Sequence, residues 1–358
     1  MNKKIAIIGT VGLPSKYGGF ETLAEYLTKH LGMDFDMTVY CSSKSYDKKL
    51  DYYNNAKMEY INLNANGVQS IPYDIISIFK ALKYADTLLI LGVSGCIVLP
   101  LVKMISNKKI IVNIDGLEWK RAKWNKYAKW FLKFSEKLAV NNADVVITDN
   151  KVIQEYVKSE YNKKSELIAY GADHVENIDM ENEIIKKYNF LKELYAFTVC
   201  RIEPENNIHM IVEAISLQTK FPLVMIGNWN SSDYGKELRN KYKNFNHIHL
   251  LDPIYDQKIL NQIRSNCYIY LHGHSAGGTN PSLVEAMALG LSVIAYNVNY
   301  NKETTNNKAN YFSNAEELKS LLDNISSQDL LEIGKNMHNV ANNRYTWKKI
   351  STQYSLLL

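Results

Sequence analysis

The four cysteines of this 358-residue chain are scattered, and no two of them have the spacing of metal ligands. Disulfide-stapled and zinc-binding domains need clustered cysteines, so the sequence argues against both classes. We expect Cys41, Cys96, Cys200 and Cys267 to be reduced core residues of a cytoplasmic protein. The first apolar run ends at Gly9, which is too early for a signal peptide and predicts a β-strand.

Long hydrophobic runs are nearly absent. Only residues 87–105 are apolar enough to suggest a membrane span, and two glycines, a serine, a proline and Lys103 interrupt them. We expect a buried strand at Leu88–Leu91, then a turn and a buried helix.

Several common catalytic signatures are also missing. The chain has no phosphate-loop Lys-Ser/Thr motif, no Ser/His/Asp arrangement and no Asp/His cluster with ligand spacing. The turn at Gly9 and Gly12 lacks the third glycine of a dinucleotide-binding fingerprint. The sequence therefore predicts neither a hydrolase, nor a dehydrogenase, nor an enzyme with a bound metal.

Positive charge gathers in the first half of the chain. Residues 1–171 carry 24 Lys and Arg against 17 Asp and Glu, whereas residues 172–358 carry 18 against 20. The basic half suggests a phosphate-bearing acceptor or an anionic membrane surface as a partner, although a solvated lysine-rich surface explains the excess equally well. We expect no nucleic-acid partner.

Residues 119–137 combine aromatic and basic side chains at helical spacing. An apolar stripe is formed by Trp124, Tyr127, Phe131 and Leu138. Largely on the other side lie Lys126, Lys129, Lys133 and Lys137, with Trp130 among them. Such a helix can rest on an anionic membrane, or it can pack its apolar stripe into the core behind a solvated lysine face.

Short apolar runs alternate with helical patterns, which is typical of parallel sheets flanked by helices. Strands are predicted at Ile5–Ile8, Met37–Tyr40, Met58–Ile61, Thr87–Leu91, Lys109–Asn113, Val145–Thr148, Ser165–Ala169, Ala196–Cys200, Pro222–Ile226, His247–Leu250, Cys267–Leu271 and Ser292–Tyr296. Helices are predicted at Phe20–Leu31, Ile75–Lys83, Ile208–Leu217, Gln257–Ser265 and Pro281–Leu289. The chain length fits two domains, and we place their boundary after Gly171.

A loop dense in glycine and small polar residues follows His272 and leads into a helix near Pro281. Backbone N–H groups in such a loop and at such a helix start attract phosphates. Glu285 lies close to the first helical turn, where its carboxylate can accept hydrogen bonds from a sugar or ribose hydroxyl. Arg201 follows another predicted strand and can clamp phosphate oxygens, or form an ion pair with a nearby glutamate.

The first half offers acidic and phenolic side chains at the ends of predicted strands. Asp115 and Asp149 can act as a base, bind an acceptor hydroxyl or cap the helix that follows. Tyr170 follows the last strand before the domain boundary. A second glycine-rich turn, expected to bind the acceptor or its phosphate, contains Gly18, Gly19, Phe20 and Glu21.

These motifs, in this order, resemble the retaining glycosyltransferases of family 4, and the resemblance runs along the full chain. Its most specific part is Ser-Leu-Val-Glu-Ala-Met-Ala-Leu-Gly at residues 282–290. It implies the GT-B fold, in which two doubly wound Rossmann-like α/β domains face a central cleft. The implied parts are an acceptor-binding domain at 1–171, a donor-binding domain at 172–340 and a C-terminal helix at 341–358 that crosses back to the first domain.

In that family the matching glutamate contacts the donor's ribose, while an arginine and a lysine hold its diphosphate. Here the lysine position is Asn206, the usual first glutamate is Gly277, and the usual histidine before the Gly-Leu-Glu-Trp-like segment is Asp115. Expected donor-binding residues are Arg201, Asn206, His272, Gly277, Gly278, Thr279, Asn280, Ser282 and Glu285. Expected catalytic residues are Asp115, Asp149 and Tyr170, with no metal.

The same motifs are similar to a bacterial subgroup that includes β-1,4-rhamnosyltransferases. That likeness implies transfer of L-rhamnose from dTDP-L-rhamnose, a co-substrate rather than a cofactor, to a lipid-diphosphate-linked saccharide of capsule or cell-wall polysaccharide. We would place such an enzyme in the cytoplasm, at the inner face of the membrane. The alternatives are another UDP, GDP or dTDP sugar, a non-hydrolysing sugar-nucleotide epimerase, or an inactive nucleotide-sugar-binding scaffold.

Overall fold

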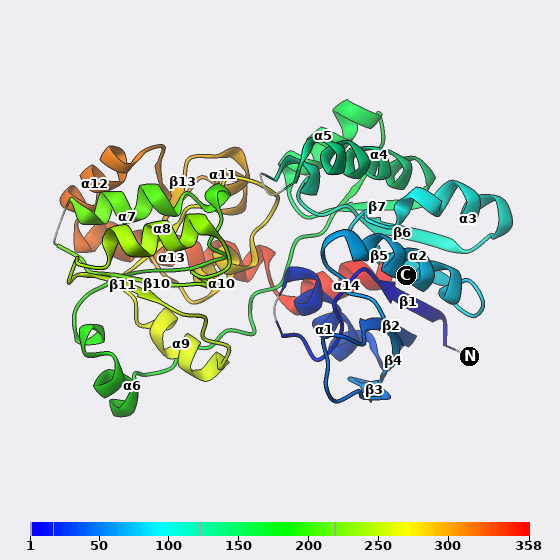
Figure 1. Cartoon of the computed structure of the whole chain (residues 1–358), viewed down its shortest axis with the longest axis horizontal. Helices are drawn as coiled ribbons and strands as arrows, with labels where there is room; N and C mark the ends of the chain where they lie inside the picture. Colours follow the sequence, from blue (N-terminus) through cyan, green and yellow to red (C-terminus); the bar gives the residue numbers. More distant parts are fainter. Residues whose placement is uncertain (1, 17, 122–123, 218–219) are drawn as a thin grey trace. The chain divides into compact units, whose positions relative to one another are not determined.

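The computed structural model describes residues 2–16, 18–121, 124–217 and 220–358. The chain forms two compact units (Figure 1). Unit 1 comprises residues 1–171 with 347–358, and unit 2 comprises residues 172–346. Each unit has its own sheet flanked by helices, so the predicted α/β class with two doubly wound domains is confirmed. No helix within the described ranges is long and apolar enough to cross a membrane.

Unit 1 is built on an eight-stranded sheet with the order β3-β4-β2-β1-β5-β6-β7-β8, in which β3 pairs antiparallel with β4 and the other pairs are parallel. Its strands are β1 (Lys4–Ile8), β2 (Asp36–Ser42), β3 (Tyr52–Tyr53), β4 (Ala56–Ile61), β5 (Thr87–Leu91), β6 (Lys109–Asn113), β7 (Val145–Thr148) and β8 (Glu166–Leu167). Its α-helices are α1 (Gly19–Leu31), α2 (Ser70–Ala81), α3 (Leu99–Ile105), α4 (Lys126–Asn142), α5 (Lys151–Tyr161) and α14 (Trp347–Leu357).

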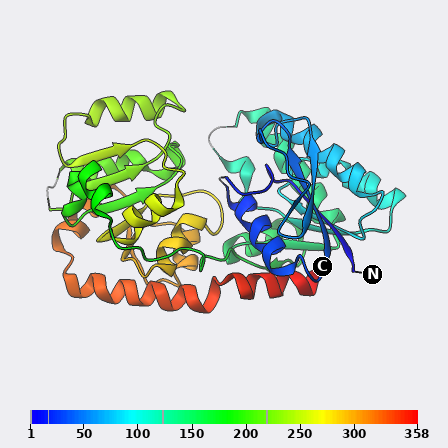
Figure 2. The same ribbon diagram turned by 90° about the horizontal axis from the view of Figure 1, so that it is seen from below.

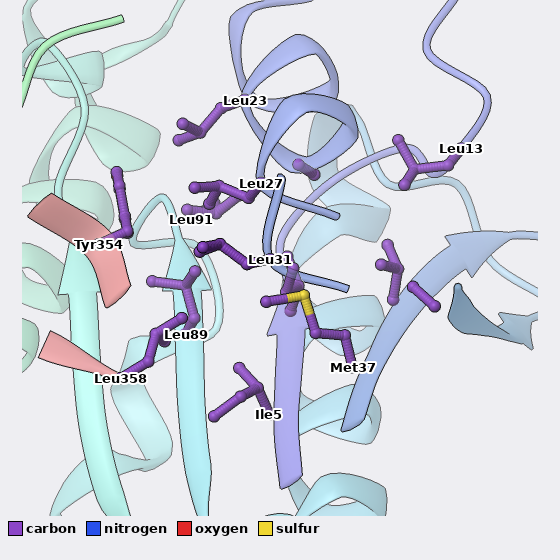
Figure 3. Packing of buried hydrophobic residues seen from close by; sticks show 14 of the residues in the cluster. Ile5, Leu13, Leu23, Leu27, Leu31, Met37, Leu89, Leu91, Tyr354 and Leu358 are labelled. Atoms are coloured by element: carbon purple, nitrogen blue, oxygen red, sulfur yellow. The ribbon is translucent and has the colours of Figure 1, made fainter. Parts of the chain in front are cut away.

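A hydrophobic core joins α1 to one face of this sheet (Figure 3). Leu23, Leu27 and Leu31 are spaced by four residues, so they share one face of α1. They meet the strand residues Ile5 and Leu89, and all five side chains are buried. Burial of each such side chain contributes about 1.5–3 kcal/mol, which fixes α1 and the turn before it on the sheet.

The last helix, α14, completes unit 1. Trp347 stacks on Tyr26 of α1 with ring centroids 4.4 Å apart, and Figure 2 shows the two helices side by side. Tyr354, further along α14, accepts a hydrogen bond from the Asn113 side chain at the end of β6. The chain therefore returns to unit 1 after it has built unit 2.

Unit 2 contains a six-stranded parallel sheet with the order β11-β10-β9-β12-β13-β14. Its strands are β9 (Ala196–Val199), β10 (Leu223–Ile226), β11 (Ile248–Leu251), β12 (Ile269–His272), β13 (Val293–Tyr296) and β14 (Asn310–Phe312). Its α-helices are α6 (Asn182–Lys187), α7 (Ile208–Ser216), α8 (Asp233–Tyr242), α9 (Gln257–Ser265), α10 (Pro281–Ala288), α11 (Asn299–Thr304), α12 (Ala315–Asn324) and α13 (Ser327–Arg344). Because α13 runs unbroken to Arg344, the returning segment begins at Trp347 and not at residue 341.

One expectation about burial in unit 1 is wrong, and one of the two alternatives for residues 119–137 does not fit the structure. The helix after β5, α3, buries only Leu99 and Val102, because seven residues offer one short face to the neighbouring elements. In α4, the expected buried stripe included Tyr127, which is 73% exposed. The buried residues of α4 are instead Leu132, Ser135, Glu136, Ala139 and Val140. The small side chains of Ser135 and Ala139 allow the helix to pack closely on its neighbours. Residues 122 and 123, within the predicted membrane-binding stretch 119–137, lie outside the described residues.

Candidate functional site

Glu21 holds the glycine-rich turn after β1 in shape. Gly18 precedes α1 with a φ of 131°, and a Cβ at this position would collide with the Glu21 carboxylate. Oε1 of Glu21 accepts a hydrogen bond of 2.7 Å from the backbone N–H of Val11. Burial raises the pKa of Glu21, although the Val11 hydrogen bond opposes this. In the loop Gly18–Glu21, predicted to bind the acceptor or its phosphate, the Glu21 carboxylate is thus engaged by the protein's own backbone.

Asp115, Asp149 and Tyr170, the three predicted catalytic residues, lie close together beyond the ends of β6, β7 and β8. Burial raises the pKa of the Tyr170 phenol well above its usual value, and the negative charges of Asp115 and Asp149 raise it further. Tyr170 is 4% exposed and Asp149 is 2% exposed, whereas Asp115 is only partly buried. Asp115 is therefore the most accessible of the three side chains.

Asn113, which sequence reasoning did not single out, organises this group. Its Oδ1 accepts a hydrogen bond from the backbone N–H of Asp115 at 3.1 Å, and its Nδ2 donates to the Tyr354 hydroxyl at 2.9 Å. Asp115 has a φ of 59°, a left-handed conformation that aspartate tolerates better than most residues. Asn113 lies two residues before Asp115, and this closeness in the sequence could have drawn attention to it. Its other partner, Tyr354 on α14, could not have been found from the sequence.

In unit 2, the loop after β9 is joined to the loop after β12 through Asn206. Its Nδ2 donates to the carbonyl of Arg201 at 2.6 Å, and its Oδ1 lies 2.7 Å from Nδ1 of His274. Asn206 was predicted to contact the donor, but the two ends of its amide are engaged by the protein. Gly273 permits this close approach, because a Cβ there would collide with the Asn206 carbonyl oxygen.

Arg201 itself stays partly free. Its side chain is 39% exposed, and its Nε lies 4.0 Å from Oε2 of Glu203. An exposed ion pair at that separation contributes little. The guanidinium can therefore exchange Glu203 for the oxygens of a diphosphate, for which a bidentate contact is stronger.

The predicted donor loop leads from β12 into α10. Gly277 has a φ of 112°, and Gly277, Gly278 and Thr279 are all buried. Asn280 caps α10, since its Oδ1 accepts hydrogen bonds from the N–H of Ser282 at 3.0 Å and from its hydroxyl at 2.8 Å. The side chains of Asn280 and Ser282, both predicted to contact the donor, thus stabilise the helix start.

His272 stands at the carboxyl end of β12 beneath this loop. Burial lowers its pKa to about 3, so the ring is neutral at physiological pH. Its Nε2 has no hydrogen-bond partner among the described residues. A buried polar atom of this kind is costly, and such atoms are often found at functional sites.

Glu285 is the most distinctive charged group of unit 2. Its carboxylate, on α10, pairs with Nη1 of Arg264 through one oxygen and with Nε2 of His174 at 3.3 Å through the other. Burial raises the pKa of Glu285, but Arg264 and His174 outweigh burial and lower it overall. The side chain is 19% exposed, so an ionised carboxylate faces the surroundings of the donor loop.

Arg264 and His174 were not predicted. Arg264 lies at the end of α9, is 2% exposed and also donates to Oδ1 of Asn261 at 2.6 Å. No spacing in the sequence relates α9 to Glu285, so the pair becomes visible only in the fold. In the ranges that the structure describes, no three His, Cys, Asp or Glu residues form a group that could hold a metal ion.

Comparisons with known protein families give two matches that meet close to the boundary between units 1 and 2. Residues 180–347 match the family model "Glycosyl transferases group 1", and residues 2–173 match "Domain of unknown function (DUF1972)". A comparison with curated proteins finds no match.

Among solved structures, sucrose-phosphate synthase from Thermosynechococcus elongatus is similar, with a TM-score of 0.82, 15% identity and coverage of 99% of this chain and 98% of that one. HepE from Anabaena in complex with UDP-glucose has a TM-score of 0.77 at 15% identity, covering 99% of this chain and 98% of the other. The trehalose 6-phosphate synthase from Burkholderia multivorans has a TM-score of 0.74 at 9% identity, with coverage of 99% and 96%. The chain thus has the GT-B fold, and its residues 180–347 are similar to the Glycosyl transferases group 1 family.

Proposed function

We propose that the protein is a retaining glycosyltransferase that moves L-rhamnose from dTDP-L-rhamnose to a lipid-diphosphate-linked saccharide of bacterial capsule or cell-wall polysaccharide. The observation that carries the proposal is the ionised Glu285 beside the glycine loop, within a matched group 1 glycosyl transferase domain. The choice of rhamnose and of a lipid-linked acceptor rests on the likeness of the sequence motifs. HepE, in complex with UDP-glucose, makes UDP-glucose the competing donor to test.

Glu285 would bind the ribose of the donor. An ionised carboxylate accepts hydrogen bonds at about four lone-pair positions. Arg264 and His174 occupy one position on each oxygen, which leaves capacity for the single 3′-hydroxyl of the deoxyribose in a dTDP sugar. The Arg264 pair also fixes the carboxylate's orientation before the donor arrives.

Arg201 and the loop amides would hold the diphosphate. The guanidinium is partly exposed, and Asn206 fixes the backbone from which it extends. The backbone N–H groups of Gly277–Thr279 supply further donors at the start of α10. These groups would stabilise the leaving diphosphate without a bound divalent metal. If EDTA abolished activity and Mg²⁺ or Mn²⁺ restored it, this part of the proposal would be wrong.

Asp115 would orient the acceptor hydroxyl and stabilise positive charge on the sugar ring. In a retaining transfer, the leaving phosphate can itself take the acceptor's proton, so no enzymic nucleophile is needed. Tyr170, whose pKa is raised by burial, stays protonated, so it can donate a hydrogen bond but does not act as a phenolate base. Together with Asp149 it would act as a positioning residue behind Asp115.

Transfer of radiolabelled sugar to a bacterial lipid extract tests the proposal. We expect label from dTDP-L-rhamnose to enter the lipid fraction with retained anomeric configuration, and label from UDP-glucose to enter far less. Asp115→Asn should lower kcat while the melting temperature stays native, and Asp47→Asn, at an exposed position of unit 1, serves as the matched control. Interconversion of free sugar nucleotides would indicate an epimerase instead. Donor binding without any transfer would indicate a scaffold.

A further inference from the structure

An aromatic face of unit 1 is left uncovered on α4. Tyr127 is 73% exposed, Trp130 is 70% exposed and Phe134 is 40% exposed. The rings of Trp130 and Phe134 stack with centroids 5.7 Å apart and planes 3° from parallel. Large aromatic side chains that lie together at the surface usually mark a binding surface.

A groove of about 480 Å³ runs along this face. Its apolar walls are formed by Trp119, Trp130 and Phe134. Its basic side chains are Lys129, Lys133 and Lys137. Lys133 pairs with Glu160 at 2.9 Å. Across the described parts of the chain, Lys129 and Lys137 have no carboxylate within ion-pair distance. The groove therefore offers an apolar surface and positive charge that the protein does not neutralise.

The walls of this groove are fixed by a buried carboxylate. Glu136 accepts hydrogen bonds from the hydroxyls of Tyr156 and Tyr161, both at 2.7 Å, and from Nε1 of Trp119 at 3.1 Å. Lys133 also lies 4.8 Å from the centre of the Trp119 ring. These contacts hold Trp119 in place from behind, so the face is shaped before any ligand binds.

The neighbouring helix α3 also exposes apolar side chains. It packs against α4, and Figure 1 shows the two helices side by side. Its Leu101, Met104 and Ile105 are exposed. Lys103 lies among them and pairs with Asp144. Two adjacent helices thus present apolar side chains interleaved with lysines.

We propose that the outer face of α4, with the groove lined by Trp119, Trp130, Phe134, Lys129 and Lys137, docks on the surface of a membrane that contains anionic lipids, and that the exposed apolar residues of the adjacent α3 extend this contact. Aromatic rings favour the boundary between headgroups and acyl chains, and lysines bind the phosphates of anionic headgroups. The excess of positive charge complements such a surface and would repel a second copy of the same face. The proposal goes beyond sugar transfer, but it would bring the acceptor-binding unit to a lipid-linked acceptor.

Sedimentation with lipid vesicles tests this proposal on the full chain, without donor or acceptor. We expect binding to vesicles of phosphatidylglycerol with phosphatidylcholine, much weaker binding to phosphatidylcholine alone, and weakening by salt. Lys129→Glu combined with Lys137→Glu should reduce binding by roughly tenfold or more. The matched control is Lys241→Glu combined with Lys335→Glu, two exposed lysines of unit 2, which should bind nearly like the wild type.

The aromatic contribution has its own test. Trp130→Ala combined with Phe134→Ala should reduce vesicle binding by roughly tenfold, whereas Tyr255→Ala combined with Leu331→Ala, exposed in unit 2, should not. Wild-type tryptophan emission should shift to the blue on binding, and Trp130→Phe should remove most of the shift. Absence of binding to anionic vesicles, or equal losses in face and control variants, would overturn the proposal. Full competition by soluble glycerol phosphate would also overturn it, in favour of a phosphate site. None of these outcomes bears on sugar transfer to a soluble acceptor.

Discussion

Single residues show most clearly how a predicted binding residue can turn out to stabilise the protein. Asn206 and Asn280 lie where the sequence placed them, at the loops beyond β9 and β12, yet their side chains hold backbone and ring atoms of the protein. Glu285, which we propose binds the donor, also has a structural partner, because its pairing with buried Arg264 lowers its pKa. Residue type and position along the chain therefore predict which loops form the site, but not which atoms remain available.

His272 should make stability depend on pH. Burial lowers its pKa from 6.5 to about 3, so between these values the unfolded chain binds a proton that the folded protein does not. Stability from this residue is therefore complete above pH 6.5 and falls as the pH drops towards 3. Each unit of pKa difference corresponds to about 1.4 kcal/mol. His272→Asn cannot take up this proton, so its free energy of unfolding should fall less steeply with acid than that of the wild type.

Urea unfolding across this pH range measures the difference between the two slopes. Effects of other titrating groups cancel when wild type and variant are compared. His30→Asn, at an exposed position of α1, is the control and should keep the wild-type slope. Equal slopes for His272→Asn and the wild type would show that His272 is not buried as a neutral ring.

At the scale of helices and strands, α4 shows where a sequence pattern stops being informative. Its helical period was correct, but the alternative in which the whole aromatic stripe packs into the core does not fit the structure, because Tyr127 is 73% exposed. The burial of Glu136 depends on hydroxyls of α5, which no pattern within α4 can reveal.

Where apolar runs are compact and bounded, as in β5, β6, β7 and α9, the predicted limits are those of the structure. The short β3 and β14 were missed because pairing with a neighbouring strand defines them.

Tyr161→Phe should loosen the packing of α5 against α4. The variant keeps the ring and removes one 2.7 Å hydrogen bond to the buried Glu136 carboxylate. A hydrogen bond to a charged group contributes about 1.5–3 kcal/mol, so the free energy of unfolding should fall by that amount. Tyr127→Phe, on the exposed face of α4, should change it by less than about 0.5 kcal/mol. Equal effects of the two variants in urea unfolding would refute the proposed role of Glu136.

For the whole molecule, the alternation of apolar strands with helical patterns indicated two α/β domains, and the return of the chain was implied by family resemblance alone. Nothing in residues 347–358 by themselves indicates packing on α1. The partners of this segment, Tyr26 and Asn113, are brought near it only by the complete fold of unit 1. The loops at the carboxyl ends of β6, β7, β9 and β12 were predictable, because parallel sheets place such loops together.

Trp347→Ala should destabilise unit 1 strongly. Trp347 is buried, stacks on Tyr26 and lies against Gly171. Truncation of a buried tryptophan costs about 3–5 kcal/mol, which chemical denaturation should detect. Leu356→Ala, at an exposed position of the same helix, should cost less than about 0.5 kcal/mol. If the two variants were equally stable, α14 would not be an integral part of unit 1.

Calorimetric titration of sugar nucleotides into the purified chain tests most directly whether the donor site is built around Glu285. The wild type should bind dTDP-L-rhamnose more tightly than UDP-glucose. Glu285→Gln should weaken that binding by about 1.5–3 kcal/mol, which is roughly tenfold to a hundredfold in Kd, because a charge-assisted hydrogen bond to the 3′-hydroxyl of the deoxyribose is lost. Glu332→Gln, an exposed glutamate of α13, should bind like the wild type. A folded Glu285→Gln variant with wild-type affinity, or a wild type that binds no sugar nucleotide, would contradict the account.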